Sequence, residues 1–158
     1  MTITTTTHLN FPGTARAALD FYQSVFGGVV EATTYGQLGM PETAPDADKI
    51  VFGRLTSQGG FDVMAYDIPS STSAEAEPTS DGTGSGTRRD QGMTITDRPF
   101  FVSVRGETLA EVTAYWERLS AGATVVEPLA ASEWSPGFGM LADRFGVTWV
   151  LDVQASGR

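Results

Sequence analysis

The sequence predicts an α+β fold made of two tandem βαβββ modules, and two internal repeats support this prediction. Residues 53–66 align without a gap on residues 139–152, 86 positions later. The pair Phe21-Tyr22 aligns on Tyr115-Trp116, 94 positions later, inside a second stretch of helical spacing. A repeated sequence indicates a repeated structural unit, so we expect a fold with a pseudo-twofold axis.

The first module is expected over residues 1–69. Thr14 is a favourable N-cap, and apolar residues at helical spacing follow it. Gly27-Gly28 ends that helix, because glycine readily adopts the backbone conformation of a helix C-terminus. Strands rich in β-branched and aromatic residues are expected at 3–11, 29–35, 49–55 and 61–68.

The middle of the chain has a different composition. Residues 70–97 are rich in Ser, Thr, Gly, Glu and Pro, and they contain few large apolar side chains. Such a segment buries too little apolar surface to offset the entropy of ordering it. We therefore expect a flexible linker at 70–97, with 70–85 as its most mobile part.

The second module is expected over residues 98–158. Thr108 and Glu111 have the spacing of a capping box, and Gly122 closes the helix that follows. The expected strands are 100–104, 124–127, 137–142 and 147–153, of which the last two form a hairpin.

Composition and charge exclude several classes of function. The formal net charge is −9, and Lys49 is the only lysine. This balance repels phosphate backbones and anionic lipid, so we expect neither nucleic acid nor a membrane as a partner. The absence of cysteine excludes disulfides and thiolate chemistry. Residues 1–8 lack a basic start followed by an apolar stretch, and we expect a cytoplasmic protein.

Four local motifs indicate a family. The segments 8–11 (HLNF) and 18–28 (ALDFYQSVFGG), followed by 134–139 (WSPGFG) and 143–149 (DRFGVTW), resemble the vicinal oxygen chelate superfamily and its PhnB-like subgroup. This superfamily includes glyoxalase I, bleomycin- and fosfomycin-resistance proteins and extradiol dioxygenases. The resemblance covers 5–68 and 98–153. It implies curved mixed sheets (the glyoxalase/bleomycin-resistance/dihydroxybiphenyl dioxygenase-like fold) that enclose a cavity between the modules.

The resemblance also implies where a divalent metal would be bound. Catalytic members hold it with His and Glu from the first and last strands of each module. His8 matches a first-strand position and is the only histidine, but Met64 and Val150 occupy the positions of the expected carboxylates. A catalytic zinc normally needs about three protein ligands. Asp62 and Asp152 lie two residues away, which is roughly 7 Å along a strand.

We therefore expect no metal or other cofactor, with His8 as a weak candidate ligand. Two functions stay open. The first is binding of a small molecule in the cavity between the modules, without catalysis. The second is a metal-dependent lyase, transferase or dioxygenase activity that uses His8. No catalytic residue is assigned, and a homodimer is expected. The candidate ligand-binding residues are polar or aromatic side chains in the predicted strands and loops: His8, Asn10, Tyr66, Trp134 and Phe138.

Overall fold

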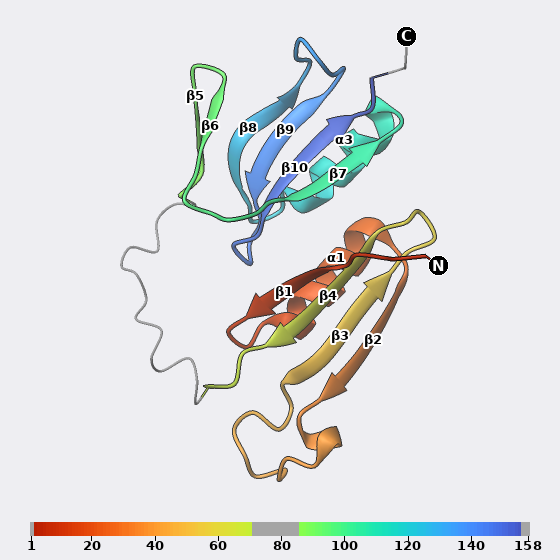
Figure 1. The fold of residues 1–158 in the computed structure, drawn as a ribbon, viewed down its shortest axis with the longest axis vertical. Helices are drawn as coiled ribbons and strands as arrows, with labels where there is room; N and C mark the ends of the chain where they lie inside the picture. Colours follow the sequence, from red (N-terminus) through yellow and green to blue (C-terminus); the bar gives the residue numbers. More distant parts are fainter. Residues whose placement is uncertain (1, 71–85, 156–158) are drawn as a thin grey trace. The chain divides into compact units, whose positions relative to one another are not determined.

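A computed structural model describes residues 2–70 and 86–155 of the chain. Its contacts divide the chain into two compact units, Met1–Ser80 and Asp81–Arg158. Each unit has its own mixed four-stranded sheet with a helix against one face (Figure 1). The predicted α+β class and the paired modules are therefore confirmed.

The first unit follows the order β1 (Thr7–Phe11), α1 (Ala15–Phe26), β2 (Val29–Thr34), β3 (Ile50–Thr56) and β4 (Asp62–Asp67), with a short 3₁₀ turn η1 (Gly36–Leu38) after β2. The order of strands across the sheet is β1-β4-β3-β2. Strand β1 is parallel to β4, and the other pairs are antiparallel. The first strand is shorter than the predicted 3–11, because residues 3–6 do not pair with β4.

The core of the first unit lies between α1 and its sheet. The buried face of α1 carries Ala18, Leu19 and Tyr22, each at most 1% exposed. Gly53 in β3 allows this close packing, since a Cβ there would lie 2.5 Å from the Leu19 Cδ1 atom. The side chains that fill the core from the strands are Leu9, Phe11, Ile50, Leu55, Val63 and Ala65.

The cap of α1 differs from the prediction. The Thr14 side chain makes no capping hydrogen bond. Instead, the buried Asp67 carboxylate at the end of β4 accepts hydrogen bonds from the Ala15 amide at 2.8 Å and from the Ile50 amide at 2.9 Å. An acidic side chain at a helix start is favourable for the same reason as a local cap, because it satisfies an otherwise unpaired N–H group.

The second unit repeats this plan with β7 (Val102–Gly106), α3 (Leu109–Leu119), β8 (Thr124–Ala130), β9 (Phe138–Ala142) and β10 (Thr148–Val153), in the sheet order β7-β10-β9-β8. The predicted capping box is present in part: the Thr108 hydroxyl accepts from the Glu111 amide at 3.2 Å, while the Glu111 carboxylate accepts from the amide of Glu107, one residue before the cap, at 3.1 Å. Within residues 2–70 and 86–155, no helix is long and apolar enough to cross a bilayer.

Strand register confirms that the repeat found in the sequence is a structural one. Gly53 pairs with Ala65 in the first sheet. Gly139 pairs with Leu151, the residue 86 positions after Ala65, in the second sheet. The parallel neighbour of Ala65 is Leu9 and that of Leu151 is Val104, so the outer strands also correspond.

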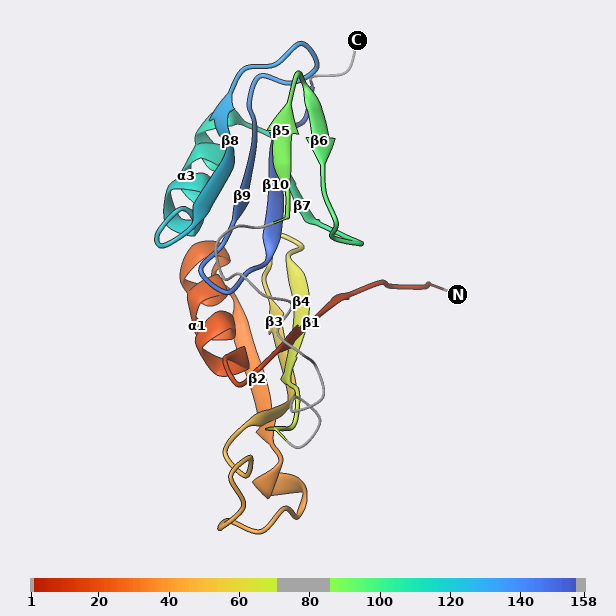
Figure 2. The ribbon, with the colours of Figure 1, turned by 90° about the vertical axis from the view of Figure 1, so that its left-hand side faces the viewer.

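A short hairpin precedes the second sheet and was not predicted. It consists of β5 (Arg88–Asp90) and β6 (Met93–Ile95), joined at Gln91 and Gly92, whose φ angles of 48° and 79° are those of a tight hairpin turn. It contacts β8 and lies on the side of the sheet opposite α3 (Figure 2). Residues 88–95 of the predicted linker therefore form a hairpin against the second sheet, whereas 71–85 lie outside the described residues.

Candidate functional site

Each sheet has one face against its helix and one face turned away from it, which we call the helix-free face. Strand alternation defines it in the first unit: Leu9 is buried toward α1, while His8 and Asn10 point the other way and are exposed. By the same alternation and the strand register, the side chains on this face include His8, Asn10, Glu31, Thr33, Phe52, Arg54, Asp62, Met64 and Tyr66.

Three of the predicted ligand-binding residues come together on this face. His8 Nδ1 lies 3.0 Å from Asn10 Oδ1, and the His8 ring meets the Tyr66 ring edge-on at a centroid distance of 5.5 Å. An amide oxygen only accepts, so in this arrangement His8 Nδ1 carries the proton. In the tautomer with its proton on Nδ1, the ring has a lone pair on Nε2 that can accept a hydrogen bond from a ligand.

The positions that would hold a metal do not carry a suitable set of ligands. Strand register places His8 beside Met64 in the first sheet and Ser103 beside Val150 in the second. The described residues contain no group of three or more His, Cys, Asp or Glu side chains arranged to hold a metal ion. One imidazole next to a thioether does not meet the needs of a catalytic divalent site. These residues therefore do not fit the metal of the catalytic relatives.

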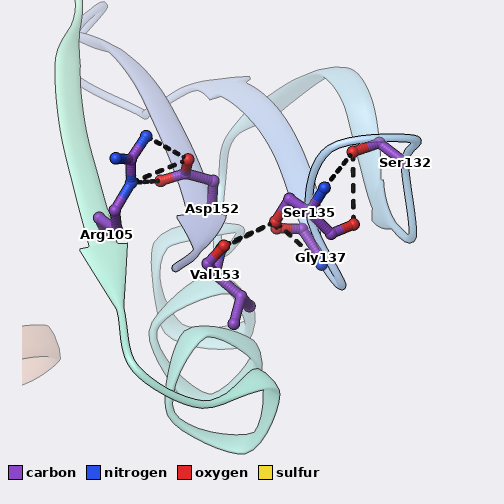
Figure 3. Close-up of polar contacts among 6 residues, drawn as sticks. All are labelled: Arg105, Ser132, Ser135, Gly137, Asp152 and Val153. Carbon is purple, nitrogen blue, oxygen red and sulfur yellow. Dashed lines mark hydrogen bonds and ion pairs between the residues drawn. The ribbon is translucent and has the colours of Figure 1, made fainter. Parts of the chain in front are cut away.

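The two nearby carboxylates are each held by an arginine. Arg54 Nε donates to Asp62 Oδ1 at 2.9 Å, and Arg54 Nη2 donates to Asp62 Oδ2. Asp152 in β10 receives Arg105 Nη2 at 2.7 Å and Nε at 3.1 Å (Figure 3). The Arg54 hydrogen bond lowers the pKa of Asp62 below its usual value, and the hydroxyl of Thr6 adds to this effect. Both carboxylates are thus engaged as anionic partners of guanidinium groups.

The other two predicted residues meet in the second unit. Trp134 and Phe138 lie edge-to-face with ring centroids 5.3 Å apart. Trp134 is 55% exposed, while Phe138 is half-buried on the helix-free face of the second sheet. The guanidinium carbon of Arg89 lies 5.2 Å from the centre of the Phe138 ring. The five predicted residues therefore form two clusters, one within each unit.

The loop that presents Trp134 is fixed by serine hydroxyls. The buried Ser135 Oγ lies 2.8 Å from the carbonyl oxygens of both Gly137 and Val153, and it accepts from their amides at 3.2 Å. Ser132 Oγ accepts from the Ser135 amide at 3.1 Å (Figure 3). These hydrogen bonds hold in place the loop that carries the exposed Trp134.

Sequence reasoning missed two residues of the second cluster. In the sequence Ser135 is only one residue of the 134–139 motif, and Arg89 lies in the predicted linker. The available signal for Arg89 was the alternation around Gln91-Gly92, which resembles a hairpin turn.

A groove in the loop between β2 and β3 was also not predicted. Its volume is about 520 Å³, and its wall includes two carboxylates, those of Glu42 and Asp48. The other lining residues are Thr34, Gly36, Gln37, Ala44 and Ala47. It lies at the end of β2, so it is separate from the cluster of aromatic and polar side chains around His8.

Comparison with known proteins gives a consistent picture. The profile of the Glyoxalase/Bleomycin resistance protein/Dioxygenase superfamily matches residues 8–151. An uncharacterised protein of Mycobacterium bovis is 30% identical over 139 residues, which are 87% of this chain and 74% of that protein. The crystal structure of protein PA1353 from Pseudomonas aeruginosa is 28% identical, with a TM-score of 0.71 over 98% of this chain and 100% of that one. A PhnB protein from Bacillus cereus shares the fold at 24% identity, with a TM-score of 0.65 over 96% of this chain and 100% of that one.

Proposed function

The chain belongs to the Glyoxalase/Bleomycin resistance protein/Dioxygenase superfamily, and we propose that it binds a small molecule without an intact metal site. The observation that carries this proposal is the strand register. It sets His8 beside Met64 and Ser103 beside Val150, where a metal would need carboxylates or imidazoles. The side chains that remain are suited to hydrogen bonding and ring contact rather than to Lewis-acid chemistry.

The His8 cluster favours a planar ligand with a hydroxyl group. His8 Nε2 offers a lone pair to a hydroxyl hydrogen, and the Asn10 amide nitrogen offers donors to an oxygen. Tyr66 and the 41% exposed Phe52 provide ring surface next to these polar atoms. We propose that this ligand is bound at the His8 cluster, in a cavity of the kind that the family resemblance implies.

Nuclear magnetic resonance can test this proposal directly, because His8 is the only histidine and its ring signals are unambiguous in a tag-free protein. Phenol, catechol and acetophenone serve as probes. We expect phenol and catechol to shift the His8 ring signals in a saturable way, and we expect Asn10→Ala to weaken the binding about tenfold, the loss of one or two hydrogen bonds. Asp20→Asn on the exposed side of α1 is the control. If none of the three probes shifts the His8 ring signals in a saturable way, the proposal is contradicted.

The alternative, a metal-dependent lyase, transferase or dioxygenase, is supported by the free lone pair on His8 Nε2 alone. Elemental analysis of purified protein, and calorimetric titration with Zn²⁺ and Mn²⁺, separate the two functions. We expect no stoichiometric metal. One equivalent per chain that is lost in a His8→Ala variant would favour the enzyme instead.

We also propose that the chain forms a homodimer, because members of this fold pair their modules within one chain or between two. Light scattering at micromolar protein checks this expectation. A mass of 16.8 kDa, that of the single chain, would exclude the dimer.

A further inference from the structure

We propose that the second sheet carries a recognition site for a planar cation, an aromatic amidine or guanidine, which hairpin β5–β6 keeps filled with its own Arg89 side chain until a ligand displaces it. The proposal goes beyond the proposed function, since it gives the Trp134–Phe138 cluster a ligand of its own. The residues on which this proposal depends do not belong to the His8 cluster.

One acidic position has different cross-strand partners in the two sheets. In the first sheet Glu31 pairs with Arg54, so the strand itself supplies a cation next to this carboxylate. In the second sheet Glu127 pairs with Met140, which is 86 positions after Arg54. Glu127 therefore has no arginine opposite it within its sheet.

Arg89 supplies a cation next to Glu127 from outside the sheet. Its Nε lies 3.6 Å from Glu127 Oε2, and its guanidinium carbon lies 5.2 Å from the Phe138 ring centre. An aromatic face together with a carboxylate is the usual environment for a planar cation in proteins. Phe138 and Glu127 thus form two walls of a cation site, and the guanidinium of Arg89 is its present occupant.

The hairpin holds Arg89 in this site with few contacts. Arg89 Nη1 donates to Thr94 Oγ1 at 2.8 Å, within the hairpin itself, and Thr94 contacts the sheet through a 3.7 Å interaction with Met140 Sδ. Arg89 Nε is buried and has no hydrogen-bond partner among the described residues. Two three-residue strands are marginal on their own, and a buried donor that makes an ion pair but no hydrogen bond weakens the closed arrangement further. Displacement of the hairpin is therefore an accessible motion.

Trp134 indicates that the ligand is more than a small cation. It extends the aromatic wall beyond Phe138 and is 55% exposed, on a loop fixed by Ser135. A ring attached to the cationic group would lie on this surface, while the amidinium or guanidinium replaces Arg89 between Phe138 and Glu127. Benzamidinium is the simplest molecule with both parts, and benzamide is its neutral counterpart of nearly the same shape.

The test titrates wild-type protein and an Arg89→Ala variant with benzamidinium and with benzamide, by calorimetry and by the indole N–H signal of Trp134. We expect Arg89→Ala to bind benzamidinium at least about tenfold more tightly than wild type, because the internal competitor is gone. Adding Glu127→Gln or Phe138→Leu should abolish this gain. Arg98→Ala is the matched control, since Arg98 is an exposed arginine whose ion pair is with Asp97.

Hydrogen exchange in the wild-type protein provides the second measurement. Benzamidinium should accelerate exchange of amides in residues 88–95 and leave that of β9 and β10 unchanged. Equal affinity of Arg89→Ala and wild type, equal binding of benzamide, or unchanged hairpin protection in the presence of bound benzamidinium would each overturn the proposal. If Arg89→Ala does not fold, the wild-type exchange result decides. A His8→Ala variant should keep the Trp134 response, so this proposal and the proposed function can fail separately.

Discussion

The two units are more alike on the side that faces the helix than on the side that does not. Matched positions toward the helix keep Gly53 with Gly139 and Leu55 with Leu141, and a Cβ at either glycine would collide with a helix side chain. On the helix-free side, by contrast, the chemistry changes at most matched positions. The pairs that change are Asp62 with Thr148, Arg54 with Met140, Met64 with Val150 and Tyr66 with Asp152.

This difference shows which face of each sheet is the more constrained in its side chains. Most positions against the helix stay apolar or glycine in both units because they are closely packed, although their volumes differ where the two cores are filled differently, as at Val63 and Trp149. Positions on the helix-free face are free to carry polar, charged or aromatic groups. The first unit places an imidazole and a tyrosine there, whereas the second unit covers part of this face with hairpin β5–β6. Functional differences between the units therefore concentrate on one side of each sheet.

The largest loss of stability is expected at the matched core positions Trp149 and Val63, whose side chains are at most 1% exposed. Trp149→Ala should cost about 4 kcal/mol of unfolding free energy, because it leaves a large cavity. Val63→Ala should cost about 1.5 kcal/mol, the value for two buried methyl groups. Urea unfolding followed by circular dichroism measures both. If both variants lost the same unfolding free energy, the Trp149 side chain would not be as tightly packed in its core as Val63 is.

The next effect concerns the turn before the last strand of each unit. Asp143 accepts hydrogen bonds from the amides of Phe145 and Val147 and from the indole nitrogen of Trp149, at 2.8–3.0 Å. Its counterpart Ser57 accepts from one amide, that of Phe61, at 3.2 Å. Asp143→Ala should therefore cost about 3 kcal/mol, and Ser57→Ala about 1 kcal/mol or less. Thermal unfolding of both variants checks this order, which a larger loss for Ser57→Ala would reverse.

The smallest expected effect is a dependence of the unfolding free energy on pH in the acidic range. Arg54 lowers the pKa of Asp62 below the usual 3.8, so the ionised carboxylate stabilises the fold above that value. This stabilisation is lost as pH falls below 3.8, through the lower pKa of the folded protein. Arg54→Met removes the main cause of the shift. The variant should lose less stability than wild type between about pH 5 and about pH 2, as measured by urea unfolding at each pH. The side chains are partly exposed, so the difference is small.

Local patterns predicted most of the fold because helical spacing, strand alternation and the internal repeat all depend on neighbouring residues. The grouping of His8 with Asn10 follows from alternation within one strand, and Tyr66 follows from the pairing of the first and last strands. Trp134 and Phe138 are close in the sequence, so their contact was accessible as well. The family was likewise evident from local motifs.

What could not be predicted depends on distant contacts. Hairpin β5–β6 has only three residues in each strand, and its charged composition resembles that of a linker. It is ordered by Arg89, whose partners are Glu127 and Phe138, and by Thr94, whose partner is Met140; each of these partners lies at least 38 residues away along the chain. Neither the pairing of Asp62 with Arg54 nor that of Asp152 with Arg105 is visible without the register of the strands.

The caps of the two helices have a consequence for the order of folding. Helix α3 is capped by Thr108, directly before its first turn, so its start is complete as soon as that turn forms. Helix α1 is capped by Asp67, which is 52 residues beyond the amide it accepts from. A nascent chain that has not yet reached β4 therefore lacks this cap. Helix α1 becomes fully stable only when the last strand of its unit is in place, whereas α3 can nucleate locally and early.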